Sequence, residues 1–496
     1  MDDRRHGDIE TTTRPTSMKL LLFMVPLIVV SVLVSFLGDF KSSWLVSLSS
    51  SEKPIGASWI NSGSEKAPPP VNSLYFIQND SIPQTTSSSA GFSIMMNVTN
   101  TGRKKRTKLE RLEAGLQAAR LAIRKAKFRP QSDGPDPDYV PSGPMYWNPK
   151  AFHRSYLEME KQFRIYIYRE GEPPLFHNGP CKGIYSIEGN FINHLEIDAR
   201  FLTDDPEKAH VFFLPFSVTA IVLFVFEGET HDWGPMKHTV ADYVKVLSEK
   251  HPYWNRSFGA DHFMLACHDW GPELSFDVPN LYNNSIRALC NANTSERFIP
   301  SKDVSIPEIH LETGSLEGLI GGPSPSKRDI LAFFAGGADH GPIRPILLQH
   351  WENKDPDIQA HPYLPKNISY YDMIRRSKFC LCPSGYEVAS PRVVEALYTG
   401  CVPVLISSSY VPPFSDVLNW KAFSVIVSVE DIPNLKKILT SISTRRYIKM
   451  YQRGLQMRKH FVVNFPPKRY DVYHMILHSI WLRRLNVRVY DSPQDI

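Results

Sequence analysis

The chain has 496 residues, of which 42% are hydrophobic and 22% are charged. This length and composition predict a globular protein of two or three domains and exclude a uniformly low-complexity chain. The formal net charge of +5 is small for this length and gives no reason to expect a nucleic-acid-binding protein, which would concentrate basic residues on one face.

An uncharged run near the N-terminus predicts a membrane anchor. Residues 20–38 read LLLFMVPLIVVSVLVSFLG, and about 20 apolar residues in a helix cross the hydrocarbon core of a bilayer. Lys and Arg residues are concentrated before this run, so residues 1–19 are assigned to the cytosol and the rest of the chain to the lumenal side. A cleaved signal peptide is the alternative, but the run exceeds the usual apolar core of ~7–15 residues. The prediction is a single-pass type II membrane protein.

Residues 39–144 are predicted to form a lumenal stem. The first part is rich in Ser, Pro, Asn and Gly, which is typical of a flexible segment. The stretch 103–128 has apolar residues at helical spacing, which predicts an amphipathic helix. The spaced residues are Leu109, Leu112, Leu116, Ala119 and Ile123. Two interpretations remain open: a helix for homo- or hetero-oligomerisation, or a strut packed on the folded head.

From residue 145 onward, apolar strand-like runs alternate with helical patterns. The predicted strands lie within 163–170, 209–216, 261–269, 328–337, 378–385, 401–407 and 423–431. Predicted helices include 236–250 and two closing segments, 443–461 and 469–488. Such alternation predicts parallel sheets covered by helices on both faces. Because a Ser-, Pro- and Gly-rich linker at 314–328 divides the strands into two series, we expect two α/β domains that face each other across a cleft, at 145–320 and 321–496.

Glycosylation sequons and cysteines agree with a lumenal head. Asparagines head Asn-X-Ser/Thr triplets at Asn79, Asn97, Asn255, Asn283, Asn293 and Asn367. The chain has six cysteines, which would form disulfides in an oxidising compartment. Six cysteines allow fifteen pairings, and the sequence does not select one.

The segment ASPRVVEALYTG at 389–400 is a candidate binding element. Ser390 is a good N-cap, so a helix is expected to begin there, with Arg392 and Glu395 near its N-terminal end. A cation at a helix N-terminus opposes the helix dipole, which favours a site where an anion binds. The carboxylate one turn later could bind ribose hydroxyls. The alternative is an exposed ion pair of about 0.3–0.5 kcal/mol.

Two other strand ends carry candidate residues. In FFAGGADHGPIR, Gly336 and Gly337 follow a strand and Arg344 lies seven residues later, a pattern that could bind a phosphate or form an ordinary strand–helix turn. In CHDW, His268 and Asp269 follow a strand and could supply a general base, although a buried His–Asp pair would look the same.

Several established motifs are missing from the sequence. It contains no G-x-x-x-x-G-K-[ST] phosphate loop, no G-x-G-x-x-G fingerprint, no G-x-S-x-G elbow and no H-E-x-x-H. Asp-Pro-Asp occurs at 136–138 and 355–357, but both triplets lie in Pro-rich polar surroundings, where a metal–diphosphate site is not expected.

The chain from residue 145 to its C-terminus resembles the plant exostosin-type glycosyltransferases of family 47. The matching motifs are FHRSYLEMEKQFRIYIYREGEPPLFHNGP, AHVFFLPFSV, GADHFMLACHDW, FFAGG followed by GPIRPILLQHW, and FCLCPSGYEVASPRVVEALYTGCVPVLI. The resemblance implies a GT-B fold with two Rossmann-like domains, the first for the acceptor and the second for a nucleotide sugar. It also implies a Golgi membrane location and transfer from a UDP-sugar with inversion and without a bound metal.

The same resemblance assigns roles to the candidate residues. Arg392 and Arg344 would neutralise the diphosphate, and Glu395 would bind the ribose. Gly336, Gly337 and Ser384 would let the backbone approach the phosphates. Asp269 or His268 would accept the proton of the attacking hydroxyl.

The implied acceptor is a plant cell-wall polysaccharide, either pectin or hemicellulose, and the identity of the sugar stays open. A second hypothesis is a non-catalytic Golgi subunit that keeps the fold and stabilises an active glycosyltransferase. A glycoside hydrolase is disfavoured because no pair of carboxylates stands out in the strand-end loops. A metal-dependent transferase of the GT-A type is disfavoured by the surroundings of both Asp-Pro-Asp triplets.

Overall fold

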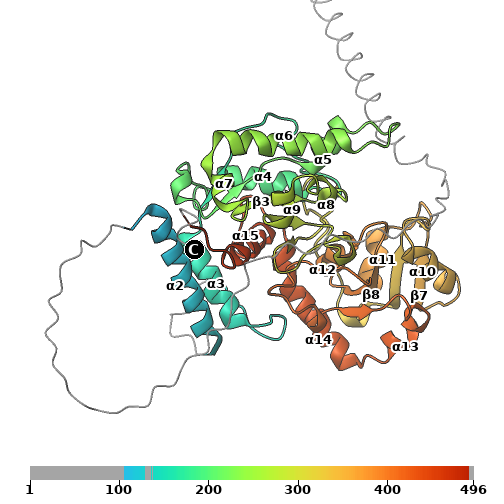
Figure 1. Cartoon of the computed structure of the whole chain (residues 1–496). Helices are drawn as coiled ribbons and strands as arrows, with labels where there is room; N and C mark the ends of the chain where they lie inside the picture. The colour runs from blue at the N-terminus through green and yellow to red at the C-terminus, as the bar shows by residue number, and fades with distance from the viewer. Residues whose placement is uncertain (1–105, 129–135, 137, 491–496) are drawn as a thin grey trace, which may run out of the picture. The chain divides into compact units, whose positions relative to one another are not determined.

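The computed structural model describes residues 106–128, 136 and 138–490 (Figure 1). The predicted anchor at 20–38 and the first part of the stem lie outside these residues, as do the sequons at Asn79 and Asn97. Within the described ranges, no helix is both long enough and apolar enough to cross a membrane.

The first sheet has five strands in the order β1-β2-β3-β4-β5, and each neighbouring pair is parallel. Its strands are β1 (Ile165–Ile167), β2 (Val211–Phe213), β3 (His262–Ala266), β4 (Ile286–Leu289) and β5 (Val304–Ser305). Its helices are α4 (Ile187–Ile197), α5 (Val218–Val225), α6 (Gly234–Lys250), α7 (Pro252–Ser257), α8 (Gly271–Leu274) and α9 (Pro279–Asn283). Strands β1 to β3 lie inside the predicted ranges, whereas β4 and β5 were not predicted.

Strand β4 was not predicted because its short apolar run is interrupted by a charged residue, Arg287. The guanidinium of Arg287 donates to both carboxylate oxygens of Asp303, at 3.1 and 2.6 Å, and both side chains are fully buried. Arg287 also donates to the hydroxyl of Ser275 at 3.0 Å. A buried cation needs such partners, and they cannot be identified from the strand's own sequence.

The second sheet also has five parallel strands, in the order β10-β9-β8-β6-β7. Its strands are β6 (Ile330–Ala335), β7 (Ile358–His361), β8 (Ser377–Pro383), β9 (Val402–Ile406) and β10 (Val425–Val427). Its helices are α10 (Ile343–Trp351), α11 (Tyr370–Arg376), α12 (Arg392–Thr399), α13 (Leu435–Thr440) and α14 (Thr444–Met457). The prediction of two parallel α/β sheets is confirmed, although the short, partly polar β7 was not predicted.

The last helix, α15 (Val472–Arg484), packs with the first sheet rather than with the second. It contacts β4 and β5, and Figure 1 shows it beside α3 (Pro149–Gln162). Trp481 is fully buried in the same core as Phe163 and Ile165. Residues after 321 were expected to belong together, but the chain returns to the first sheet, because the apolar surface of α15 is buried there.

The predicted amphipathic helix is α2 (Lys108–Phe128), which begins five residues later than residue 103. Thr107 and Glu110 exchange hydrogen bonds of 2.8 and 3.1 Å in a capping box, which fixes this start. Leu116 and Ala119 are fully buried where α2 packs on α3. The apolar face is therefore covered by the protein's own head, which agrees with the strut interpretation.

Candidate active site

A pocket of about 400 Å³ combines residues from both sheets. Segments of the first sheet contribute Ile184, Asp269, Glu308 and His310. Segments of the second sheet contribute Ala335, His340, Arg344, Tyr370, Glu387, Ala389, Ser390, Pro391, Arg392 and Glu395. Of the eight predicted catalytic and nucleotide-sugar-binding residues, the pocket is lined by Asp269, Arg344, Arg392 and Glu395.

The strand order of the second sheet explains why these residues meet. The chain leaves β6 for β7 on one side and returns to β8 on the other side, so the order reverses between β6 and β8. Open α/β sheets bind ligands at such a switch point, at the carboxyl ends of the strands. Strand β6 ends at Ala335 and strand β8 ends at Pro383, and the predicted binding residues follow these two ends.

Arg392 is fixed against the end of β6. Its Nη2 and Nε donate to the carbonyl oxygen of Ala335 at 2.8 and 3.3 Å, and its Nη1 donates to the hydroxyl of Ser390 at 3.4 Å. Ser390 was expected to be the N-cap, but helix α12 begins at Arg392 and Ser390 makes no capping hydrogen bond. A Cβ at Gly336 would lie 2.4 Å from Nη2, so the glycine makes room for this guanidinium.

Arg344 is the most unusual charge in the pocket. It lies in α10 and is only 7% exposed, and its Nε is buried without a hydrogen-bond partner among the described residues. Burial, followed by repulsion from Arg392, lowers the pKa of Arg344 to about 10. Two neighbouring guanidinium groups, one of them with an unused donor, are stabilised when an anion binds between them.

Glu395 faces the same pocket from α12. Its Oε2 accepts a hydrogen bond of 2.8 Å from the hydroxyl of Tyr370 in α11. Burial raises the pKa of Glu395, while the bond from Tyr370 and the charge of Arg392 act in the opposite direction. A carboxylate held in this way is a rigid acceptor for a ligand hydroxyl.

The predicted backbone contacts with phosphate do not fit the observed hydrogen bonds. The amide of Gly336 donates to the carbonyl of His361 at 3.1 Å, and the amide of Ser384 donates to the carbonyl of Ile406 at 3.1 Å. Both amides therefore extend the sheet and are not free for a phosphate. Gly337 has no close contact that requires a glycine, because the nearest atom to a Cβ there would be 3.5 Å away.

The structure separates the two candidate bases after β3. Asp269 lines the pocket, and burial raises its pKa to about 6, against the lowering effect of a hydrogen bond from Tyr185. His268 is not among the lining residues. Its Nδ1 accepts the amide hydrogen of Trp270 at 3.1 Å, and burial lowers its pKa to about 4. A neutral ring of this kind carries its proton on Nε2 and has no free lone pair for a base.

The loop that carries these two residues is held by a buried carboxylate that the sequence did not reveal. Glu188 lies in the first turn of α4 and is completely buried. It accepts the amide hydrogens of Cys267 at 2.8 Å and His268 at 3.0 Å, and the hydroxyl of Ser217 at 2.5 Å. Glu188 thereby fixes the end of β3 and positions Asp269.

Two further acids in the pocket were also missed. Burial and the charge of Asp269 raise the pKa of Glu308 well above its ordinary value. Burial raises the pKa of Glu387 to about 8, and its Oε2 accepts a hydrogen bond of 2.7 Å from Asn291. Glu308 follows β5 in the run VSIPEIH, so recognition of that short strand would have revealed it. No comparable sequence signal marks Glu387, because its partner Asn291 comes from the other sheet.

Residues 159–442, more than half of the chain, match the exostosin GT47 domain. The chain belongs to the exostosin GT47 family. A probable glycosyltransferase of Arabidopsis thaliana is 59% identical to this GT47 protein, over 97% of this chain and 96% of the relative. The expected family is thus confirmed.

More distant relatives and the similar solved structures give less information about this chain. A probable glucuronoxylan glucuronosyltransferase of Arabidopsis thaliana is 29% identical, over 60% of this GT47 chain and 66% of the relative. The crystal structure of Anabaena HepE in complex with UDP-glucose aligns with a TM-score of 0.31 and 11% identity, over 60% of this chain and 95% of that one. A similarity at that level does not bear on the site.

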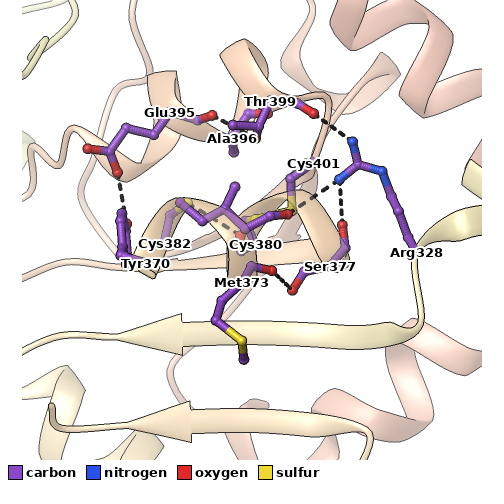
Figure 2. Close-up of a disulfide and its surroundings, with 11 residues drawn as sticks. Arg328, Tyr370, Met373, Ser377, Cys380, Cys382, Glu395, Ala396, Thr399 and Cys401 are labelled. Atoms are coloured by element: carbon purple, nitrogen blue, oxygen red, sulfur yellow. Dashed lines mark hydrogen bonds between the residues drawn. A yellow bond between two sulfur atoms is a disulfide. The ribbon is translucent and has the colours of Figure 1, made fainter. Parts of the chain in front are cut away.

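In this GT47 protein, helix α12 is anchored at its C-terminal end. Figure 2 shows the buried Arg328 directed at backbone carbonyls: it donates to Ser377 at 2.8 Å and to Thr399 at 2.6 Å. The disulfide Cys380–Cys401 joins β8 to Cys401, which lies two residues after the end of α12. These contacts hold α12, and therefore Arg392 and Glu395, at a fixed position relative to β8.

The remaining cysteines and both Asp-Pro-Asp triplets lie outside the pocket lining. Cys267 pairs with Cys290, and Cys181 and Cys382 are free thiols. The carboxylates of triplet 136–138 pair with Arg469, and those of 355–357 pair with Lys436. Within the described residues, no group of three or more His, Cys, Asp or Glu side chains is arranged to hold a metal ion.

The sequons on the described residues differ in accessibility. Asn255, Asn283 and Asn367 are exposed. Asn293 is 5% exposed, and its Oδ1 accepts hydrogen bonds from the amide and the hydroxyl of Ser295 at 3.1 and 2.7 Å. Asn293 could carry a glycan only if its side chain left this position.

Proposed function

We propose that the protein is an inverting glycosyltransferase of GT-B type that transfers a sugar from a UDP-sugar to a plant cell-wall polysaccharide. The observation that carries this proposal is the pair Arg344 and Arg392 at the switch point of the second sheet, where a buried guanidinium nitrogen lacks a partner. The diphosphate of the donor would supply the missing acceptor, and its negative charge increases as the glycosidic bond breaks.

The residues around this anion site support defined roles. Glu395, held by Tyr370, would accept a hydrogen bond from a ribose hydroxyl. The acceptor hydroxyl would attack the anomeric carbon, its proton would move to Asp269, and UDP would leave with the electron pair of the broken bond. A base with a pKa near 6 is ionised at neutral pH and can still accept a proton.

The location is part of the same proposal. We propose that residues 20–38 anchor the chain in the Golgi membrane with the head in the lumen. The disulfides Cys267–Cys290 and Cys380–Cys401 support an oxidising compartment. The helix α2 does not favour the alternative of a non-catalytic subunit that binds a partner through it, because Leu116 and Ala119 on its apolar face are already buried against α3.

The relatives supply a candidate donor and acceptor. The similarity to a probable glucuronoxylan glucuronosyltransferase supports the inclusion of UDP-glucuronate among the donors and xylan among the acceptors. The test uses the full-length chain in detergent with a panel of UDP-sugars and wall oligosaccharides, with and without EDTA. Release of UDP should occur with one donor and persist in EDTA.

The variants Arg392→Ala and Glu395→Ala should abolish this release. Arg376→Ala is the matched control, because Arg376 is exposed and pairs with Asp329. If the folded wild-type chain binds no UDP, the transferase proposal is wrong. Loss of release in EDTA would contradict transfer without a metal.

A further inference from the structure

An aromatic surface begins at the residue next to Asp269. The ring of Trp270 lies 4.8 Å from the ring of Trp233 and 4.9 Å from that of Phe226, measured between ring centroids. These three half-buried residues are here called the aromatic shelf. Phe226 directly follows α5, Trp233 directly precedes α6, and Trp270 lies in the loop after β3; Figure 1 shows these elements. Beside them on α5, Leu223 and Phe224 are 64% and 60% exposed. A gathering of exposed apolar side chains of this kind marks a binding surface.

The shelf is continuous with the pocket. The ring of Trp270 also contacts His268, with 5.4 Å between centroids, and His268 packs on Tyr185 at 4.7 Å. Tyr185 donates its hydroxyl hydrogen to Asp269, and its neighbour Ile184 lines the pocket. A row of rings therefore leads from the shelf to the carboxylate that faces the reacting atoms.

The charges around the shelf are acidic. The loop between α5 and α6 exposes Glu227, Glu229 and Asp232. The lysine of α6 that lies near this surface, Lys237, is bound to Glu273 at 2.5 Å. A polysaccharide that carries a carboxylate on each sugar would be repelled here, whereas a neutral one would not.

We propose that the aromatic shelf binds the acceptor and that this acceptor is a neutral polysaccharide chain rather than a polyuronide. The C–H faces of neutral sugar rings pack against the faces of Trp233 and Trp270, and the terminal hydroxyl reaches Asp269 from the shelf side. This inference rests on the proposed transferase function and selects between its two acceptor classes, in favour of a neutral hemicellulose backbone.

The test measures binding of oligosaccharides to the full-length chain in detergent by saturation-transfer NMR and titration. The probes are neutral β-1,4-linked xylo- and gluco-oligosaccharides and oligogalacturonides of equal length. Neutral probes should bind, and Trp233→Ala or Trp270→Ala should weaken their binding by about ten-fold. The affinity for UDP should not change. Trp147→Ala is the matched control, since Trp147 is exposed and lies outside the shelf and the pocket lining.

A second variant tests the charge argument. The triple change E227Q/E229Q/D232N should increase binding of oligogalacturonides relative to neutral probes, because it removes three negative charges from the rim. Equal or tighter binding of oligogalacturonides by the wild type would overturn the proposal, as would binding of neither probe class by a chain that still binds UDP. Unchanged neutral binding in both tryptophan variants would overturn it too, and an altered oligomeric state in those variants would then identify a protein interface. Absence of UDP binding would instead refute the transferase function.

Discussion

The first and second sheets each have five parallel strands, but only the second sheet's segments place arginines in the pocket. The second sheet's segments supply both arginines of the pocket, Arg344 and Arg392. The first sheet's segments supply Asp269 and Glu308, two acids whose pKa is raised by burial. One edge is therefore suited to binding an anion and the other to accepting a proton, although the backbone architecture is similar.

Replacement of the proposed base, Asp269, tests the role of the first sheet and should have the largest effect. Asp269→Asn should lower the turnover of sugar transfer by about 10²–10⁴-fold, because an amide cannot accept the proton, while the affinity for UDP stays unchanged. In the wild type, kcat/KM should fall below about pH 6 as Asp269 is protonated. Steady-state kinetics would check both results. Asp357→Asn is the control, because Asp357 is exposed and pairs with Lys436. Full activity in Asp269→Asn would assign the base elsewhere.

Replacement of Arg344, whose buried Nε lacks a hydrogen-bond partner among the described residues, tests the role of the second sheet. Arg344→Leu should lower kcat/KM for the donor by about 10²–10³-fold, because the diphosphate loses a charged donor. The melting temperature should not fall, since the variant removes a buried charge that is repelled by Arg392. Steady-state kinetics and thermal unfolding would test whether kcat/KM falls while the melting temperature is kept, with Arg376→Leu as the control. A large loss of stability would mean that Arg344 is structural.

The anchor of helix α12 should affect stability more than chemistry. Arg328→Met removes donors from the carbonyls of Ser377 and Thr399 and should lower the free energy of unfolding by about 2–4 kcal/mol. Arg328→Lys should recover only part of this loss, because an ammonium lacks the planar fork. Urea unfolding is the measurement, with the exposed Arg446→Met as control. An unchanged midpoint would show that the disulfide alone fixes the helix.

The smallest effect concerns the acid that joins the two sheets. Glu387 has a folded pKa of about 8 against an ordinary value of 4.5, so its protonated form adds stability that is complete below about pH 4.5 and is lost as the pH rises through 8. Glu387→Gln keeps the acceptor for Asn291 without titrating. Its melting temperature should exceed that of the wild type by about 1–2 °C at pH 8.5 and match it at pH 5. The exposed Glu317→Gln should behave like the wild type.

Local sequence patterns predicted much of this protein. Apolar runs separated by helical patterns gave two parallel α/β sheets, and the spacing of Leu116 and Ala119 gave the amphipathic helix. Strand-end positions identified Asp269, Arg344, Arg392 and Glu395, because parallel strands bring their carboxyl ends to one edge of a sheet. These features depend on interactions between residues that are near one another in the chain.

The tertiary structure decided what depends on distant partners. The amides of Gly336 and Ser384 are not free for a phosphate, because they donate to the carbonyl oxygens of His361 and Ile406 on neighbouring strands. The disulfide pairing, the return of α15 to the first sheet and the exclusion of His268 as a base likewise follow from packing. The sequence alone therefore determined which strands and charges exist, whereas the folded chain determined which of those charges are left without a partner, since burial and hydrogen bonding are set by residues far away in the sequence.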